Sequence, residues 1–184
     1  MLDRDGDTKH SGRMTRFMWR MAATLSTAIQ FALVASLSFS LALLLSVVLP
    51  DSSDTAMIGA LWAMISAIIV TQETRSATIS MGGLRVMGSF IGAVFSAVYL
   101  ILFPFSIVGM GVLIGIVVLT CVLIGMPGYL RLAALTAGIV LVISAQNPDI
   151  PPLVNAAHRF LEVIIGSSVA IAAAWVWQYL FKSS

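Results

Sequence analysis

Charge is the property that this sequence has least of. Only 10% of its 184 residues are Asp, Glu, Lys or Arg, whereas about 25% is usual in soluble domains. Hydrophobic residues make up 59%, and the mean hydropathy is +1.02. So little charge excludes an ordinary soluble globular protein, because its surface could not be covered. The high hydrophobicity also excludes intrinsic disorder.

Residues for several kinds of chemistry are missing as well. The single cysteine, Cys121, allows no intrachain disulfide, and we expect it to be a small core residue. The sequence contains no Walker A motif, no paired-Cys pattern and no H-E-x-x-H pattern for a metal. His10 lies in a polar tail, while His158 either bonds a neighbour or lies at the lipid interface. We therefore expect no enzyme activity, no cofactor and no metal.

Long apolar runs are present instead, and they make the bilayer the expected solvent. About 20 residues cross ~30 Å of hydrocarbon. Turn clusters, prolines and polar stops divide the chain into six runs. The predicted fold is therefore an all-α integral membrane protein with six transmembrane helices, and the third and fourth form a tight hairpin. The expected spans are 24–49, 56–72, 78–103, 106–125, 130–146 and 153–180.

The segment before the first span is polar and basic. Arg13, Arg16 and Arg20 share one helical face, which predicts an interfacial amphipathic helix over 13–21. The apolar run that follows, 22–49, is too long for the ~7–15-residue core of a cleavable signal. We expect residues 1–21 to be a cytoplasmic tail and 22–181 to be the transmembrane domain. The juxtamembrane position of the basic residues also argues against nucleic-acid binding.

The basic residues indicate the orientation, since Lys and Arg accumulate in cytoplasmic segments. Placing both termini in the cytoplasm puts nine of the ten basic residues inside, and leaves acidic residues alone in the outer loops. We expect a multi-pass protein of a bacterial inner membrane. The inside residues are Arg4, Lys9, Arg13, Arg16, Arg20, Arg75, Arg85, Arg131 and Lys182; the outer loops hold Asp51, Asp54 and Asp149.

An offset of 74 residues aligns the second half of the chain with the first. Gln72 then matches Gln146 and Arg85 matches Arg159, in one gapless register. Each half would contain three spans, so the two halves would cross the membrane in opposite directions. We expect a 3+3 inverted repeat, about 24–103 and about 106–180. Transport sites in such proteins lie near the midplane, at the interface between the repeats.

The charges inside the spans are the candidate site. Arg85 and Arg159 are each expected about 9–10 Å inside their helices, where charge is costly and usually faces a water-filled path. Snorkelling at the interface is the alternative for both arginines. Glu162, at i+3 from Arg159, could form a purely structural pair, compete with the substrate or carry a proton. The predicted substrate-binding set is Arg85, Arg159, Glu162, Gln72 and Gln146.

Glycines and one tryptophan complete the features within the spans. Small residues four apart let helix backbones approach closely in lipid. Trp62, in the middle of a span, either packs or lines a cavity. The predicted helix-packing residues are Gly88, Gly92, Gly111, Gly115 and Gly166.

Three short motifs resemble the fusaric acid resistance (FUSC) and aromatic acid exporter superfamily. They are Trp62-Ala63 with the polar stop Gln72-Glu73-Thr74, the R-x-x-G-x-x-x-G run from Arg85 to Gly92, and Arg159-x-x-Glu162 followed by Gly166. The resemblance covers residues 22–181. The superfamily is similar to the plant aluminium-activated malate channels, and this similarity implies organic-anion substrates. Many members add a cytoplasmic domain and a second membrane half, and without them we expect a homodimer or higher oligomer.

The resulting hypothesis is an inner-membrane transporter that exports aromatic or other carboxylates along an arginine-lined path. The alternatives are a passive organic-anion channel and a non-transporting membrane subunit of a larger complex. The expected partners are the lipid bilayer, a small organic anion and further copies of the chain. A periplasmic adaptor protein would favour an efflux pump, and flux that follows voltage without proton coupling would favour the channel.

Overall fold

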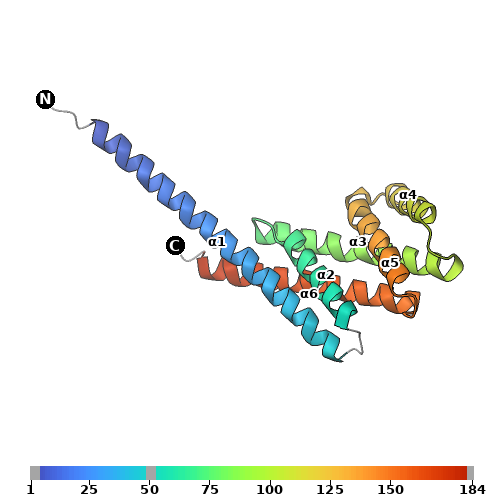
Figure 1. Ribbon diagram of the computed structural model, residues 1–184. Coiled ribbons are helices and arrows are strands. Elements are labelled where there is room, and N and C mark those ends of the chain that lie inside the picture. Colours follow the sequence, from blue (N-terminus) through green and yellow to red (C-terminus); the bar gives the residue numbers. More distant parts are fainter. Residues whose placement is uncertain (1–4, 49–52, 182–184) are drawn as a thin grey trace. The chain divides into compact units, whose positions relative to one another are not determined.

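The computed structural model describes residues 5–48 and 53–181, and every regular element in these ranges is a helix. The expected all-α fold is therefore confirmed for the described residues. Figure 1 shows the helices in chain order. They are α1 (Asp5–Val48), α2 (Ser53–Val70), α3 (Arg75–Leu102), α4 (Ile107–Leu123), the 3-10 turn η1 (Pro127–Tyr129), α5 (Leu130–Gln146) and α6 (Pro152–Phe181).

Five of the six helices match the predicted spans to within three residues at either end. The exception is α1, which begins at Asp5 and continues without a break into the first span. No proline interrupts this stretch, so nothing removes its backbone hydrogen bonds. The predicted helix over 13–21 is thus part of α1, and its interfacial position stays a prediction. Arg4, Asp51 and Lys182, and the side chains of Arg13 and Arg16, lie outside the described part of the structure.

Within the described ranges, four helical segments are long and apolar enough to cross a membrane: Thr24–Ser46, Arg75–Leu102, Pro127–Gln146 and Pro152–Tyr179. The helices α2 and α4 are apolar but shorter, with 18 and 17 residues, or about 25–27 Å. Large apolar side chains on the outer surfaces are exposed, including Leu41, Val108 and Leu123. Hydrocarbon is the solvent that suits such a surface.

Helix ends follow local side-chain chemistry. Thr74 caps α3 by accepting a hydrogen bond from the backbone N–H of Ala77 at 3.2 Å, which explains why α3 begins before residue 78. The end of α4 is a Schellman motif, in which the N–H groups of Gly125 and Met126 bond the carbonyls of Val122 and Cys121. Gly125 has φ +75°, a backbone conformation that favours glycine.

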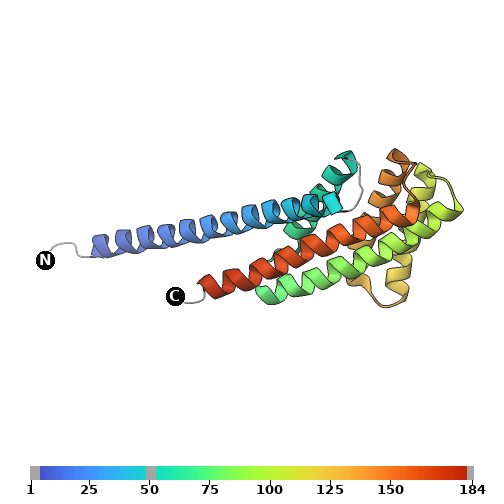
Figure 2. The same cartoon turned by 90° about the horizontal axis from the view of Figure 1, so that it is seen from below.

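The helices α3 and α6 lie side by side and run in opposite directions (Figures 1 and 2). Two contacts establish this register: Arg75 with Trp175 at one end of the pair, and Phe90 with Phe160 near the middle of α3. The helix α2 packs along α6, whereas α5 packs along α3 and carries α4 on its other side. The long antiparallel pair is therefore the centre of the fold.

The core between these helices is built largely from alanine, valine and glycine. Cys121 is buried between α4 and α5, as expected of a core residue. The chain divides into two units, residues 1–33 and 34–184, and the core residues found in the described part of the chain all lie in the second unit. There Val34 and Ala42 of α1 pack against α2. The core clusters are Leu113, Val117, Cys121, Ala133, Ala137 and Leu141; Val34, Ala67, Val70 and Ala170; Ala93, Ala97, Val140 and Ala156; and Ala42, Ala60 and Ala63.

Candidate functional site

The buried charges lie where α2 meets the α3–α6 pair. Along α2, Gly59 lies against α6, while Trp62 and Ser66 lie against α3. Seven residues separate Gly59 from Ser66, which is about 10 Å along the helix. One face of α2 therefore joins the two charged regions.

Arg85 is completely buried near the middle of α3. It is ten residues from the first residue of α3, or about 15 Å, which is deeper than the ~10 Å expected from the sequence. The difference arises because the helix begins at Arg75 instead of Thr78. The guanidinium donates to the Ser66 hydroxyl from Nη2 at 3.0 Å and from Nε at 3.3 Å. A snorkelling arginine would reach the interface, so this geometry favours a charge held inside the helix bundle.

Trp62 forms the second wall around Arg85. The Arg85 Cζ atom lies 5.0 Å from the centre of the Trp62 ring, within the range of a cation–π contact. Ser66 donates its hydroxyl hydrogen to the Trp62 carbonyl oxygen at 2.9 Å, so its oxygen is oriented to accept from Arg85. Among the described residues, neither Nη1 of Arg85 nor Nε1 of Trp62 has a hydrogen-bond partner, although both are buried.

The second buried arginine has a carboxylate beside it. Nη2 of Arg159 lies 2.9 Å from Oε1 of Glu162, one turn further along α6. Both side chains are buried, and Arg159 is seven residues inside α6, about 10 Å, as expected. The Glu162 carboxylate lies against Gly59, where a Cβ atom would collide with it. Glycine at position 59 therefore makes the space that the carboxylate occupies.

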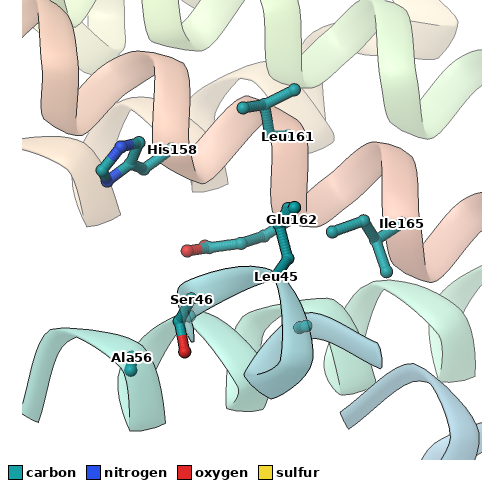
Figure 3. Close-up of a pocket in the computed structure, with 9 residues that line it drawn as sticks. Leu45, Ser46, Ala56, His158, Leu161, Glu162 and Ile165 are labelled. Atoms are coloured by element: carbon teal, nitrogen blue, oxygen red, sulfur yellow. The ribbon is translucent and has the colours of Figure 1, made fainter. Parts of the chain in front are cut away.

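A small pocket opens beside Glu162, among the end of α1, the start of α2 and the first half of α6. It holds about 320 Å³ of empty space, including its open side, and Figure 3 shows the Glu162 carboxylate pointing into it with His158 and Ser46 near by. Most of its lining is apolar. The lining residues are Ala42, Leu45, Ser46, Ala56, Gly59, His158, Leu161, Glu162 and Ile165.

The two arginines therefore differ in their electrostatic surroundings. Arg159 forms an ion pair, whereas Arg85 has a hydroxyl and an aromatic ring but no acidic partner among the described residues. Phe90 of α3 contacts Phe160 of α6, and the two helices are antiparallel. Arg159, one residue before Phe160, is therefore level with about residue 91 of α3. The two charges are thus separated by about six residues along this helix pair, or ~9 Å. A buried cation without an anion is costly, and an incoming anion would relieve that cost.

The two glutamines that were predicted to bind substrate lie apart from the arginines. Gln72 is in the α2–α3 loop, where its side-chain amide donates to the Ile69 carbonyl at 3.0 Å. Gln146 is exposed at the last residue of α5. Both lie near helix ends, and their part in binding stays a prediction.

The glycines that were predicted to pack helices fall into two groups. A Cβ atom at Gly88 or Gly92 would meet α5, and one at Gly166 would meet the backbone of α2 at Ala63 and Ala67. No atom lies within 4 Å of the corresponding positions at Gly111 and Gly115 on α4. Gly88, Gly92 and Gly166 therefore allow close helix contacts within the chain, whereas Gly111 and Gly115 face no other part of the chain.

Other buried polar residues join α5 to the central pair, and sequence reasoning did not identify them. The Thr136 hydroxyl donates to Ser89 at 3.0 Å, and the Ser96 hydroxyl bonds the Ala137 carbonyl at 3.1 Å. Asn155 donates from its side-chain amide to Ser144 at 2.7 Å and to the Val140 carbonyl at 3.1 Å. One signal in the sequence could have identified such a residue: Ser89 lies four residues after Arg85, so both are on the same face of the helix.

No cluster of three metal-ligating side chains occurs in the described residues.

Apolar spanning helices around buried charges define a multi-pass α-helical membrane protein with a polar site inside its bundle. A sequence profile of the fusaric acid resistance protein-like family matches residues 41–173, most of the chain, so the chain belongs to that family. The family has a membrane transport or resistance role, and its members are transporters rather than enzymes. A search of curated proteins and a search of solved structures each gave no match.

Proposed function

We propose that this protein exports small organic anions, aromatic or other carboxylates, and that Arg85 binds the carboxylate. The observation that carries the proposal is the burial of Arg85 beside Ser66 and Trp62, with no acidic partner among the described residues. A guanidinium holds several donors in fixed directions, so Arg85 can stay bonded to Ser66 and still donate to a carboxylate, which a lysine cannot do with the same geometry.

The position of the arginines supports a path across the membrane. Arg85 lies about 5 Å to one side of the midpoint of α3, and Arg159 is level with a residue just beyond it. A carboxylate moving along the α3–α6 pair would meet both charges in turn. Charged residues at this depth usually line substrate pathways or relays. In this proposal Glu162 competes with the substrate for Arg159.

The helix pairing supports the proposed 3+3 inverted repeat. If α1, α2 and α3 correspond to α4, α5 and α6, then the packing of α2 on α6 corresponds to the packing of α5 on α3. The lengths agree as well, with 18 and 17 residues in α2 and α5, and 28 and 30 in α3 and α6. Gly92 against α5 and Gly166 against α2 are the equivalent close contacts. We infer that Arg85 and Arg159 are related by the same pseudo-two-fold axis.

The orientation and surroundings of the protein follow from the same proposal. With both termini in the cytoplasm of a bacterium, the inner ends of α3 and α6 meet at the Arg75–Trp175 contact, 3.4 Å from Cζ to the ring centre. A tryptophan with an arginine is typical of a membrane interface. The pocket beside Glu162 then opens toward the outer face.

Flux of carboxylates into liposomes tests this function. The purified protein should transport members of a panel that includes benzoate and other carboxylates. Arg85→Gln should nearly abolish flux, and Arg85→Lys should reduce it partly, because an ammonium group keeps the charge but lacks the fixed donor directions of the guanidinium. Arg131→Gln, at an exposed position on α5, is the matched control and should leave flux unchanged.

Each outcome of this experiment selects one function. Normal anion flux by Arg85→Gln would show that Arg85 is structural and would overturn the site. Flux that follows voltage and ignores a proton gradient would favour a passive channel. No flux of any carboxylate by the wild-type protein would favour a non-transporting subunit.

A further inference from the structure

Two buried N–H donors belong to side chains that contact each other where α2 meets α3. Nη1 of Arg85 and Nε1 of Trp62 each lack a hydrogen-bond partner among the described residues, and the side chains that carry them are 5.0 Å apart from Cζ to ring centre. Both groups can only donate, so neither can satisfy the other. A buried donor without an acceptor costs free energy, and one acceptor group that reached both donors would remove both costs.

The neighbouring hydroxyl cannot fill this need. Ser66 uses its hydrogen for the Trp62 carbonyl and its oxygen for Nη2 and Nε of Arg85. This arrangement also orients the guanidinium, because two of its nitrogens are held by one oxygen on α2. The third nitrogen, Nη1, is left for another partner.

We propose that the Trp62 indole N–H is the second donor of the anion site, and that Arg85 and Trp62 bind the two oxygens of one carboxylate. This inference rests on the proposed transport of organic anions and specifies the group recognised. A carboxylate brings two acceptor oxygens to two donors and supplies the negative charge that Arg85 lacks. A neutral molecule such as water would satisfy the donors but would leave the charge uncompensated.

The position of Trp62 fits a binding role better than a packing role. A tryptophan used only for its apolar ring usually places Nε1 against a partner or at the membrane interface. Trp62 instead is 7% exposed, in the middle of α2 and one turn from Ser66. By contrast, Trp175 is 51% exposed on α6, although its ring also contacts an arginine. The two tryptophans therefore form a natural pair of test and control.

Trp62→Phe tests the inference because phenylalanine keeps an aromatic ring beside Arg85 and removes the N–H. Binding of radiolabelled benzoate to the purified full-length protein should weaken roughly tenfold, the effect of one hydrogen bond to a charged group. In liposomes the KM for benzoate should rise by a similar factor, with the maximal rate changed less than twofold. Trp175→Phe should bind and transport benzoate as the wild type does.

The result that overturns the inference is unchanged benzoate affinity in Trp62→Phe. If Arg85→Gln still loses binding in that case, the proposed function stands and only the role of Trp62 falls. Failure of the wild type to bind any carboxylate of the panel overturns both. If Trp62→Phe does not fold, benzothienylalanine at position 62 is the second variant, because it keeps the shape of the side chain and replaces the N–H with sulfur. Its affinity for benzoate should also be roughly tenfold weaker than that of the wild type.

Discussion

Arg159 and Glu162 form an ion pair at 2.9 Å on α6, and the residue that matches Glu162 in the 74-residue alignment is Gly88. The two arginines that the sequence matches are therefore paired differently. Arg159 has a carboxylate of its own helix, whereas Arg85 is next to a hydroxyl and an indole. In the proposed function, Arg85 is therefore the arginine that binds a ligand, and Arg159 is the one whose ion pair also stabilises the fold.

Arg159→Gln should destabilise the protein more than Arg85→Gln does. Removing Arg159 leaves the buried Glu162 carboxylate without this cation, and breaking a buried ion pair typically costs about 3–5 kcal/mol. The double variant Arg159→Gln/Glu162→Gln should recover most of that loss, because no charge of the pair remains. The measurement is the thermal unfolding temperature in detergent. It is read as the fraction of protein that still elutes as a single species in size-exclusion chromatography after heating.

The same variants separate folding from transport. The double variant should be stable yet impaired in carboxylate flux, since the second charge on the path is gone. Equal melting temperatures for Arg159→Gln and Arg85→Gln would contradict the assignment of a structural pair.

Gly166→Ala should lower the free energy of unfolding by about 1–3 kcal/mol, the usual cost of overpacking. An added Cβ atom would collide with the Ala63 carbonyl and lie 3.0 Å from the Ala67 nitrogen, and backbone atoms of α2 cannot move aside as a side chain can. Gly83→Ala on α3 is the matched control, because nothing lies within 4 Å of its Cβ position. A larger loss for Gly83→Ala than for Gly166→Ala would refute this account of the α2–α6 contact.

Cysteine labelling should place the loop between α5 and α6 outside the cell. In a Cys121→Ala background, Asp149→Cys in that loop should react with an impermeant thiol reagent on intact cells. Gly128→Cys, between α4 and α5, should react only after lysis. Both positions are exposed, so burial does not explain a difference. The reverse pattern would reject the proposed orientation and, with it, the cytoplasmic termini.

The protein should form a homodimer or higher oligomer, with α4 as the proposed contact. Gly111 and Gly115 lie one turn apart with open space around them, and small residues at this spacing let two helices approach closely in lipid. Gly88 and Gly92 are not candidates for this contact, because they pack against α5 within the chain. Gly111→Leu/Gly115→Leu should shift the mass in nanodiscs toward the 19.6 kDa monomer. A wild-type protein that transports as a monomer would exclude the oligomer.

The sequence alone predicts the helices well, because long apolar runs bounded by polar or proline-containing turns leave few alternatives in a bilayer. Without water, a spanning segment must satisfy its own backbone hydrogen bonds, and a helix does so locally. The caps at Thr74 and Gly125 are equally local, and so is the spacing that places Arg159 beside Glu162. The depth of Arg85 was underestimated because the cap extends α3 backward to Arg75.

What the sequence could not determine is which helix faces contact one another. The spans are apolar on nearly every side, so no hydrophobic stripe marks the face that turns inward. Tertiary structure alone places Ser66 and Trp62 against Arg85, and Gly59 against Glu162. It also separates Gly166, which meets a backbone, from Gly111, which meets nothing in the chain. In lipid these pairings depend on close packing and interhelical hydrogen bonds, and both require the positions of residues far apart in the sequence.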